Sequence, residues 1–188
     1  MAVEYLYPAT SDDVDAEWAI GGDTPAGTKH ESIDDTQGAD DEDTTFIKST
    51  SVLDEQDGQL GDCSALQDAD TINEVRVYWV GEETSGHADA RLDIGVRNAA
   101  DSDYTTVEVN ASAPNWTHGD FALALDPTGN AWTLARINAL FWYVESNWNG
   151  KNAGVEWRLT SFYLKITYTV AAGGVVGQVY RRTIMQGV

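Results

Sequence analysis

The sequence predicts an all-β fold: an antiparallel β-sandwich of the jelly-roll type, with long acidic N-terminal loops and almost no helix. Three observations lead to this fold class. From residue 71 onward, apolar and polar residues alternate in short segments, as in strands with one buried and one hydrated face. Turn-forming segments such as "GEETSG", "NAADSD" and "DPTGN" separate them. Only "TLARINAL" has a helical pattern, and many short strands with so little helix are typical of a two-sheet sandwich.

The chain has 188 residues, a length typical of one domain that buries about 70% of its unfolded surface. We expect a single sandwich domain over residues 1–170, acidic and loop-rich up to residue 70 and strand-rich from residue 71. Residues 171–188 are rich in glycine and then apolar and basic. They are expected to form either a C-terminal extension that docks on a neighbouring subunit or the last strand of the sandwich.

Each strand is expected where the alternation is regular. Four of them cover residues 71–81, 88–98, 104–110 and 120–126. The residues expected on the core face are Val75, Val77 and Trp79 in the first strand, Ala90, Leu92, Ile94 and Val96 in the second, and Phe121, Leu123 and Leu125 in the fourth.

A fifth, long strand is expected over residues 155–170. Its apolar positions change phase near residues 160–162, and one extra residue in a strand moves every later side chain to the other face. The phase change therefore predicts a β-bulge. The short helix in "TLARINAL" is expected to begin with Thr133 as its N-cap.

Acidic residues dominate the chain, with 31 Asp and Glu against 11 Lys and Arg and a formal net charge of −20. Nucleic acids and anionic membrane surfaces are excluded as partners, because binding phosphate requires many basic residues. Asp outnumbers Glu by 20 to 11. This bias resembles proteins of salt-loving organisms, whose carboxylate surfaces stay hydrated in brine, and indicates a halophilic or marine source.

The N-terminal segment "MAVEYLYPATSDD" has neither the basic nor the apolar region of a signal peptide, and no apolar run approaches the length of a membrane span. We expect synthesis in a cytoplasm without a signal peptide. Cys63 is the only cysteine, so an internal disulfide is excluded.

Several loose motifs occur in a characteristic order over residues 5–170. They are "YPATSDDV", "EWAIGGDTPAGTKHESIDD", "DDEDTTFIKS", "INEVRVYWVG", a turn with Pro127, Gly129, Trp132 and Thr133, and a strand with Leu164, Ile166, Thr167 and Tyr168. In this order they resemble the jelly-roll structural and decoration proteins of tailed phages and related viruses. The resemblance implies a non-enzymatic protein on the virion surface, as a capsid decoration or cement protein, a head fibre or a tail module. It also implies a homo-oligomer, such as a trimer, that contacts other virion proteins such as the major capsid protein.

An enzyme would need a constellation of catalytic residues, and the three histidines lie in separate segments with no metal-binding spacing. Glu145 and Glu156 flank a Trp-rich loop and are the best carboxylate pair for a glycosidase or lyase. We expect them to be solvated loop charges, and the chain to be no enzyme.

No cofactor is expected, with one exception. Asp40, Asp41 and Asp43 cluster hard oxygen ligands in a turn-forming segment, which suits Ca²⁺. The alternative is a hydrated acidic loop without an ion.

The segment "DPTGNAWTLARINALFWYVESNWNG" holds the two remaining candidate sites. Around Phe141, Trp142 and Tyr143 both faces of the expected strand are apolar, so it is buried either within the chain or against another subunit. These three residues, with Arg181 and Arg182 of the tail, form the predicted assembly contact. The alternative function is a carbohydrate-binding module that recognises a receptor, with Trp148 as the stacking ring and Asn147 and Asn149 beside it.

Overall fold

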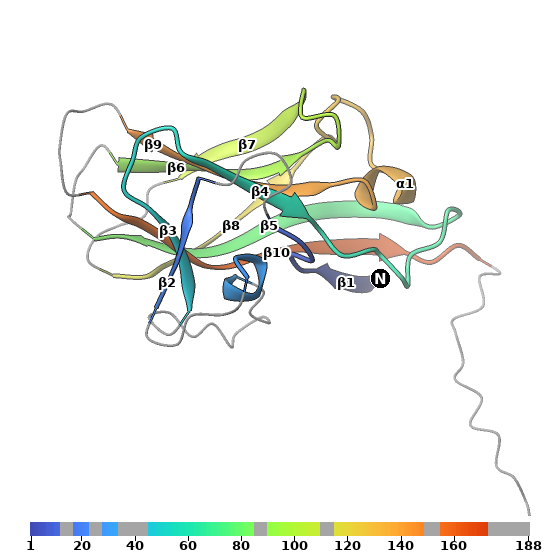
Figure 1. Cartoon of the computed structure of the whole chain (residues 1–188). Helices are drawn as coiled ribbons and strands as arrows, with labels where there is room; N and C mark the ends of the chain where they lie inside the picture. Colours follow the sequence, from blue (N-terminus) through green and yellow to red (C-terminus); the bar gives the residue numbers. More distant parts are fainter. Residues whose placement is uncertain are drawn as a thin grey trace, which may run out of the picture.

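The structure is a computed structural model. It describes residues 1–11, 17–22, 28–33, 45–84, 90–109, 115–148 and 155–172, apart from the side chain of Trp148. Nearly all of the regular structure consists of antiparallel strands in two layers, a β-sandwich of the jelly-roll type (Figure 1). The fold class predicted from the sequence is confirmed.

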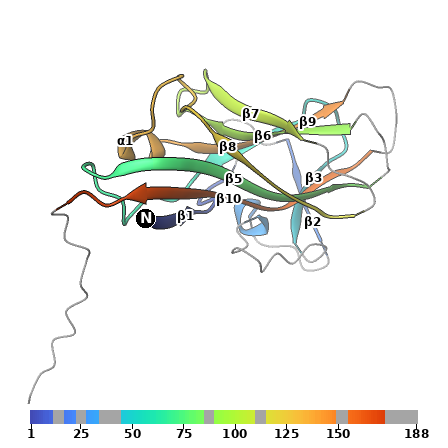
Figure 2. The same cartoon turned by 180° about the vertical axis from the view of Figure 1, so that it is seen from behind.

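The first layer is a six-stranded sheet in the order β2-β3-β10-β5-β8, with β1 also paired to β10. Its strands are β1 (Ala2–Leu6), β2 (Ala19–Gly21), β3 (Phe46–Ser49), β5 (Thr71–Glu83), β8 (Thr117–Leu123) and β10 (Trp157–Thr169). The two 13-residue strands β5 and β10 pair along nearly their whole length and form the centre of this sheet. In the reverse view they cross the molecule side by side (Figure 2).

The second layer is a four-stranded sheet in the order β4-β9-β6-β7. Its strands are β4 (Glu55–Gln59), β6 (Ala90–Arg97), β7 (Tyr104–Val109) and β9 (Phe141–Trp148). Strands far apart in the sequence therefore lie next to one another, so side chains from four segments meet on one sheet face.

The core lies between the two sheets and follows the predicted alternation. The expected core faces of β5 and β6 are buried, as are Trp142 of β9 and Trp157 of β10. Leu125 is an exception, because β8 ends at Leu123 and the turn that follows leaves Leu125 47% exposed. The prediction was wrong there because the turn begins before the alternation in the sequence ends.

The β-bulge predicted in the last strand is confirmed. The pairing of β10 with β5 shifts between Leu159 and Ser161, so Thr160 is the extra residue. Its hydroxyl donates to the carbonyl of Thr45 at 2.7 Å, which fixes the bulge to the segment before β3.

Helical structure is confined to short turns among the described residues. A 3-10 turn, η1, covers His30–Ser32, and α1 covers Leu134–Ile137. Thr133 is the N-cap of α1 as predicted, since its side chain accepts a hydrogen bond from the backbone N–H of Arg136. Within the described ranges no helix is long and apolar enough to cross a membrane.

Candidate functional site

The outer face of the four-stranded sheet carries the candidate site. Trp142 and Val144 of β9 point into the core. Because side chains alternate along a strand, Phe141, Tyr143 and Glu145 of the same strand face outward. Pairing with β4, β6 and β7 sets outward residues of those strands beside them.

An open hollow of about 290 Å³ lies on this face, near the lower end of ligand-pocket volumes. It is lined by Glu55, Tyr104, Thr106, Tyr143 and Glu145. Gly95 of β6 pairs with Tyr143 on one side and with Thr106 on the other, so no side chain fills the space between them. A Cβ at Gly95 would come within 2.0 Å of the carbonyl oxygen of Thr105, so the close approach of β7 requires glycine.

Tyr104 provides the exposed aromatic surface of the hollow. This residue is 39% exposed, and its ring stands edge-on to that of Tyr143, with 4.8 Å between the ring centroids. The Tyr104 hydroxyl donates to the carboxylate of Asp101, which orients the ring from the turn before β7. One ring is thus presented to solvent while the other is buried below it.

A buried ion pair lies on the same face of the sheet. Arg97 of β6 and Asp57 of β4 are fully buried, and the Arg97 guanidinium binds the Asp57 carboxylate across the intervening strand β9. The guanidinium also lies over the ring of Phe141, 4.2 Å from its centroid. These contacts hold the outward residues of β4, β6 and β9 in one arrangement.

Tyr143 and Glu145 are electrostatically linked. The Tyr143 hydroxyl donates to Glu145 at 3.0 Å, and burial together with the nearby carboxylates of Glu145 and Glu55 holds the pKa of this tyrosine far above its ordinary value. Burial raises the pKa of Glu145; the bond from Tyr143 opposes this rise, and the charge of Asp93 adds to it. The phenol therefore stays protonated and remains a donor to the carboxylate.

The predicted assembly contact is covered by this chain itself. Trp142 is in the core beside Phe162, Phe141 is under Arg97, and Tyr143 is under Tyr104. Both faces of the apolar strand are thus covered by this chain, and its composition is no longer evidence for a second subunit. Arg181 and Arg182 lie outside the described residues, and a virion-surface role stays a prediction from the sequence.

Of the predicted sugar-binding residues, Asn147 lies near the hollow. Asn147 is on the same outward face as Glu145, and its side-chain amide donates to Asp93 at 2.9 Å. Strand β9 continues through Trp148. The side chain of Trp148 and all of Asn149 lie outside the described part.

Glu145 and Glu156, the carboxylates considered for a glycosidase and expected to be solvated loop charges, lie at different sheets, and both are partly buried, with Glu145 inside strand β9 rather than in a loop. Glu145 is on the four-stranded sheet, whereas Glu156 adjoins the six-stranded sheet and pairs with Lys48 and Arg158. The calcium candidates Asp40, Asp41 and Asp43 lie outside the described residues. Within the described ranges, no group of three or more His, Cys, Asp or Glu could hold a metal ion.

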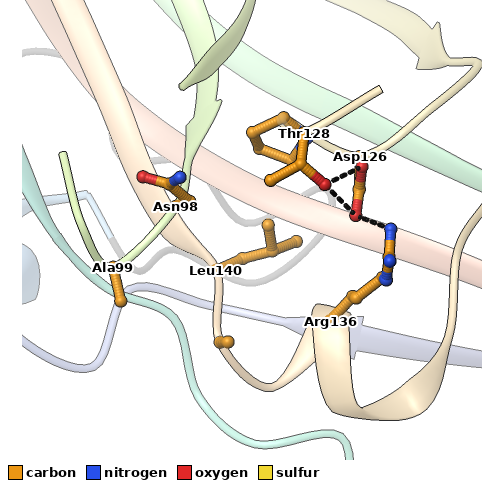
Figure 3. Close-up of a pocket in the computed structure, with 8 residues that line it drawn as sticks. Asn98, Ala99, Asp126, Thr128, Arg136 and Leu140 are labelled. Atoms are coloured by element: carbon orange, nitrogen blue, oxygen red, sulfur yellow. Dashed lines mark hydrogen bonds and ion pairs between the residues drawn. The ribbon is translucent and has the colours of Figure 1, made fainter. Parts of the chain in front are cut away.

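A second hollow, of about 240 Å³, lies beside α1 (Figure 3). Its one buried charge, Asp126, accepts hydrogen bonds from the Thr128 hydroxyl, the Asn130 backbone N–H and the Arg136 guanidinium. These bonds close the turn between β8 and α1, and the rest of the lining is mainly apolar. We assign this carboxylate to turn structure.

Four tyrosines cluster on the outer face of the six-stranded sheet. Tyr78 and Tyr163 stack with centroids 4.9 Å apart, while Tyr5 and Tyr7 pack against Tyr163 from β1 and the residues after it. The rings cover one another and strengthen the pairing of β1 with β10.

Glu55, Tyr104 and Thr106 are the site residues that the sequence reasoning missed. Their strands are short and polar, and nothing in either segment shows that both lie beside β9. The alternation in "YTTVEVN" places Tyr104 and Thr106 on one face, but the partner of that face depends on strand order.

No family model matches the chain, and no curated protein matches it. Solved structures that are similar include TmCBM61 in complex with β-1,4-galactotriose, with 14% identity and a TM-score of 0.37 over 78% of this chain and 86% of that one. The CBM22-1 xylan-binding domain from Paenibacillus barcinonensis Xyn10C has 17% identity and a TM-score of 0.38 over 89% and 94%. The adhesin domain of Lys-gingipain from Porphyromonas gingivalis has 10% identity and a TM-score of 0.42 over 89% and 98%. At these identities and TM-scores, the similarity carries no argument about what this chain binds.

Proposed function

We propose that this chain is a carbohydrate-binding β-sandwich module and that the hollow on the four-stranded sheet is its binding site. The observation that carries the proposal is the exposed ring of Tyr104 beside the carboxylates of Glu55 and Glu145 in one hollow. A pyranose has an apolar face that packs on an aromatic ring, and a rim of hydroxyls that donate to carboxylates. A few fixed polar groups around an apolar surface are what a small-ligand site requires.

The proposed role is binding without turnover. Glycoside cleavage needs two carboxylates that flank the scissile bond. Glu55 and Glu145 are direct cross-strand partners, so they stand side by side in the lining of the hollow. This arrangement suits hydrogen bonds to neighbouring hydroxyls of one sugar ring.

The test is calorimetric titration of the full chain with a panel of short oligosaccharides, together with product analysis after incubation. We expect binding to at least one sugar without released product. Tyr104→Ala should weaken that binding about tenfold or more, the effect of removing a central aromatic contact.

Two controls match this variant. Tyr5→Ala removes the same ring from the opposite sheet, and Val107→Ala shortens a residue of the same strand and similar exposure whose side chain is on the other face of β7. Both should bind like the unmodified chain. If Trp148→Ala abolishes binding while Tyr104→Ala has no effect, the ligand binds at the end of β9 instead and the hollow is not the site.

A further inference from the structure

Four carboxylates form a continuous row across the outer face of the four-stranded sheet. In the strand register, Glu55 of β4 is opposite Glu145 of β9, Glu145 is opposite Asp93 of β6, and Asp93 is opposite Glu108 of β7. Each of the four strands therefore contributes one acidic side chain to the row. Like charges directly opposite one another in a sheet destabilise it. The row is therefore unfavourable for folding unless neighbouring groups compensate its charges.

Two carboxylates of the row are compensated within the sheet. Asp93 accepts a hydrogen bond from Asn147, and Glu108 lies 3.5 Å from the guanidinium of Arg91. These two, on β6 and β7, are not among the residues that line the hollow.

The other two, Glu55 and Glu145, line the hollow and form no ion pair within the described residues. Their shared neighbour is the Tyr143 hydroxyl, a neutral group with a single proton. The nearby Arg97 is already held by Asp57 and Asp101. The pKa of Glu145 is raised, first by burial, which agrees with a carboxylate that lacks a cation.

We propose that the hollow selects sugars that carry a free amino group, with the ammonium between Glu55 and Glu145 and the sugar ring against Tyr104. This inference rests on the proposed function and specifies its ligand class. An ammonium forms charge-assisted hydrogen bonds to both carboxylates and is attracted to the tyrosine rings. Uronic acids and sulfated sugars are repelled by the same two carboxylates.

The test compares three trimers of equal length by calorimetric titration at a pH where the amine is protonated: glucosamine, N-acetylglucosamine and glucose. Short trimers are used because a long polycation would bind a chain of charge −20 non-specifically. We expect the glucosamine trimer to bind about tenfold more tightly than the other two.

Variants separate the site from general electrostatics. Glu145→Gln and Glu55→Gln should each remove most of the preference for the amine, whereas Glu31→Gln, which neutralises an exposed carboxylate of η1, should leave it unchanged. Tyr104→Ala should weaken the binding of every trimer that binds.

The outcomes distinguish the two proposals. If the glucose trimer binds as tightly as the glucosamine trimer, with a loss in Tyr104→Ala, the amine preference is overturned and the carbohydrate site stands. If no trimer and no other oligosaccharide binds, both fall. If a lysine tripeptide binds as tightly as the glucosamine trimer and Tyr104→Ala affects neither, the hollow is a general cation site and the sugar selectivity is overturned.

Discussion

The titration of Glu145 links the site to stability. Its pKa is raised above the ordinary 4.5, so the folded chain binds this proton more tightly than the unfolded chain. The resulting stability is fully present below pH 4.5 and is lost as the pH rises through the folded-state pKa. Glu145→Gln, which mimics the protonated form, should therefore melt at a higher temperature than the unmodified chain at neutral pH.

Melting curves of the unmodified chain and Glu145→Gln, recorded from neutral to acidic pH, test the predicted direction of the difference in melting temperature. The two transitions should converge as the pH approaches 4.5 and below. A variant that is less stable than the unmodified chain at neutral pH would show that the carboxylate has a stabilising partner, and would remove a premise of the amine proposal.

Glu4 is predicted to have the opposite pH dependence. Burial alone would raise its pKa, but bonds from the Cys63 thiol and from the backbone N–H groups of Ser64 and Ala65 outweigh burial and lower it. Stability from a lowered carboxyl pKa is present above the ordinary 4.5 and is lost as the pH falls through the folded-state value.

Glu4→Gln should thus destabilise the fold at neutral pH by roughly 1–3 kcal/mol, because these donors lose a charged acceptor. Urea unfolding at neutral pH and at low pH measures the difference, which should shrink in acid. Glu31→Gln serves as the control, since Glu31 is exposed and accepts one bond from Thr28. An unchanged urea midpoint in Glu4→Gln would contradict this role.

Among the elements, β10 depends on its bulge. Thr160 is fully buried, and its hydroxyl donates to the carbonyl of Thr45. Thr160→Val keeps the shape of the side chain but leaves that carbonyl without this donor. We expect a loss of about 1–3 kcal/mol in the free energy of unfolding. Thr160→Ser, which retains the hydroxyl, should lose less, and equal losses in the two variants would show that the methyl group rather than the bond matters.

The sequence predicts those elements that depend on local signals and misses the features that depend on strand order. The strands after residue 71, the bulge and the helix cap were predictable because each depends on local alternation or on a capping residue, as Thr160 and Thr133 illustrate. The hollow was not, since it forms only when Glu55 of β4 and Tyr104 of β7 are placed on either side of β9 and β6. That strand order depends on long-range pairing, which no single segment encodes.

The missing information on strand pairing also explains why β9 was predicted to be an assembly contact. Its sequence shows correctly that both faces are apolar, but the group that lies over Phe141 is the guanidinium of Arg97, 44 residues earlier in the chain. Without the register of β6 against β9, a covered strand cannot be told from a subunit contact.

At the scale of the whole molecule, the net charge of −20 makes the compact state repel itself. Raising NaCl from 0.1 M to 1 M shortens the screening length from about 10 Å to about 3 Å. We therefore expect the melting temperature to rise with salt. A variant with the exposed Asp62 and Asp68 changed to Asn should show a smaller rise, because less repulsion remains to be screened.

Added salt should weaken binding of the amino sugar, although it stabilises the fold. The attraction between an ammonium and the partly exposed carboxylates of the hollow is weakened by the same screening that relieves repulsion within the fold. Affinity for the glucosamine trimer should therefore fall over the salt range in which the melting temperature rises, while affinity for a neutral trimer that binds should change little. Titrations and melting curves at matched NaCl concentrations measure both quantities. If affinity and melting temperature rise together, contacts other than charge hold the amino sugar, and Glu55 and Glu145 are not its ligands.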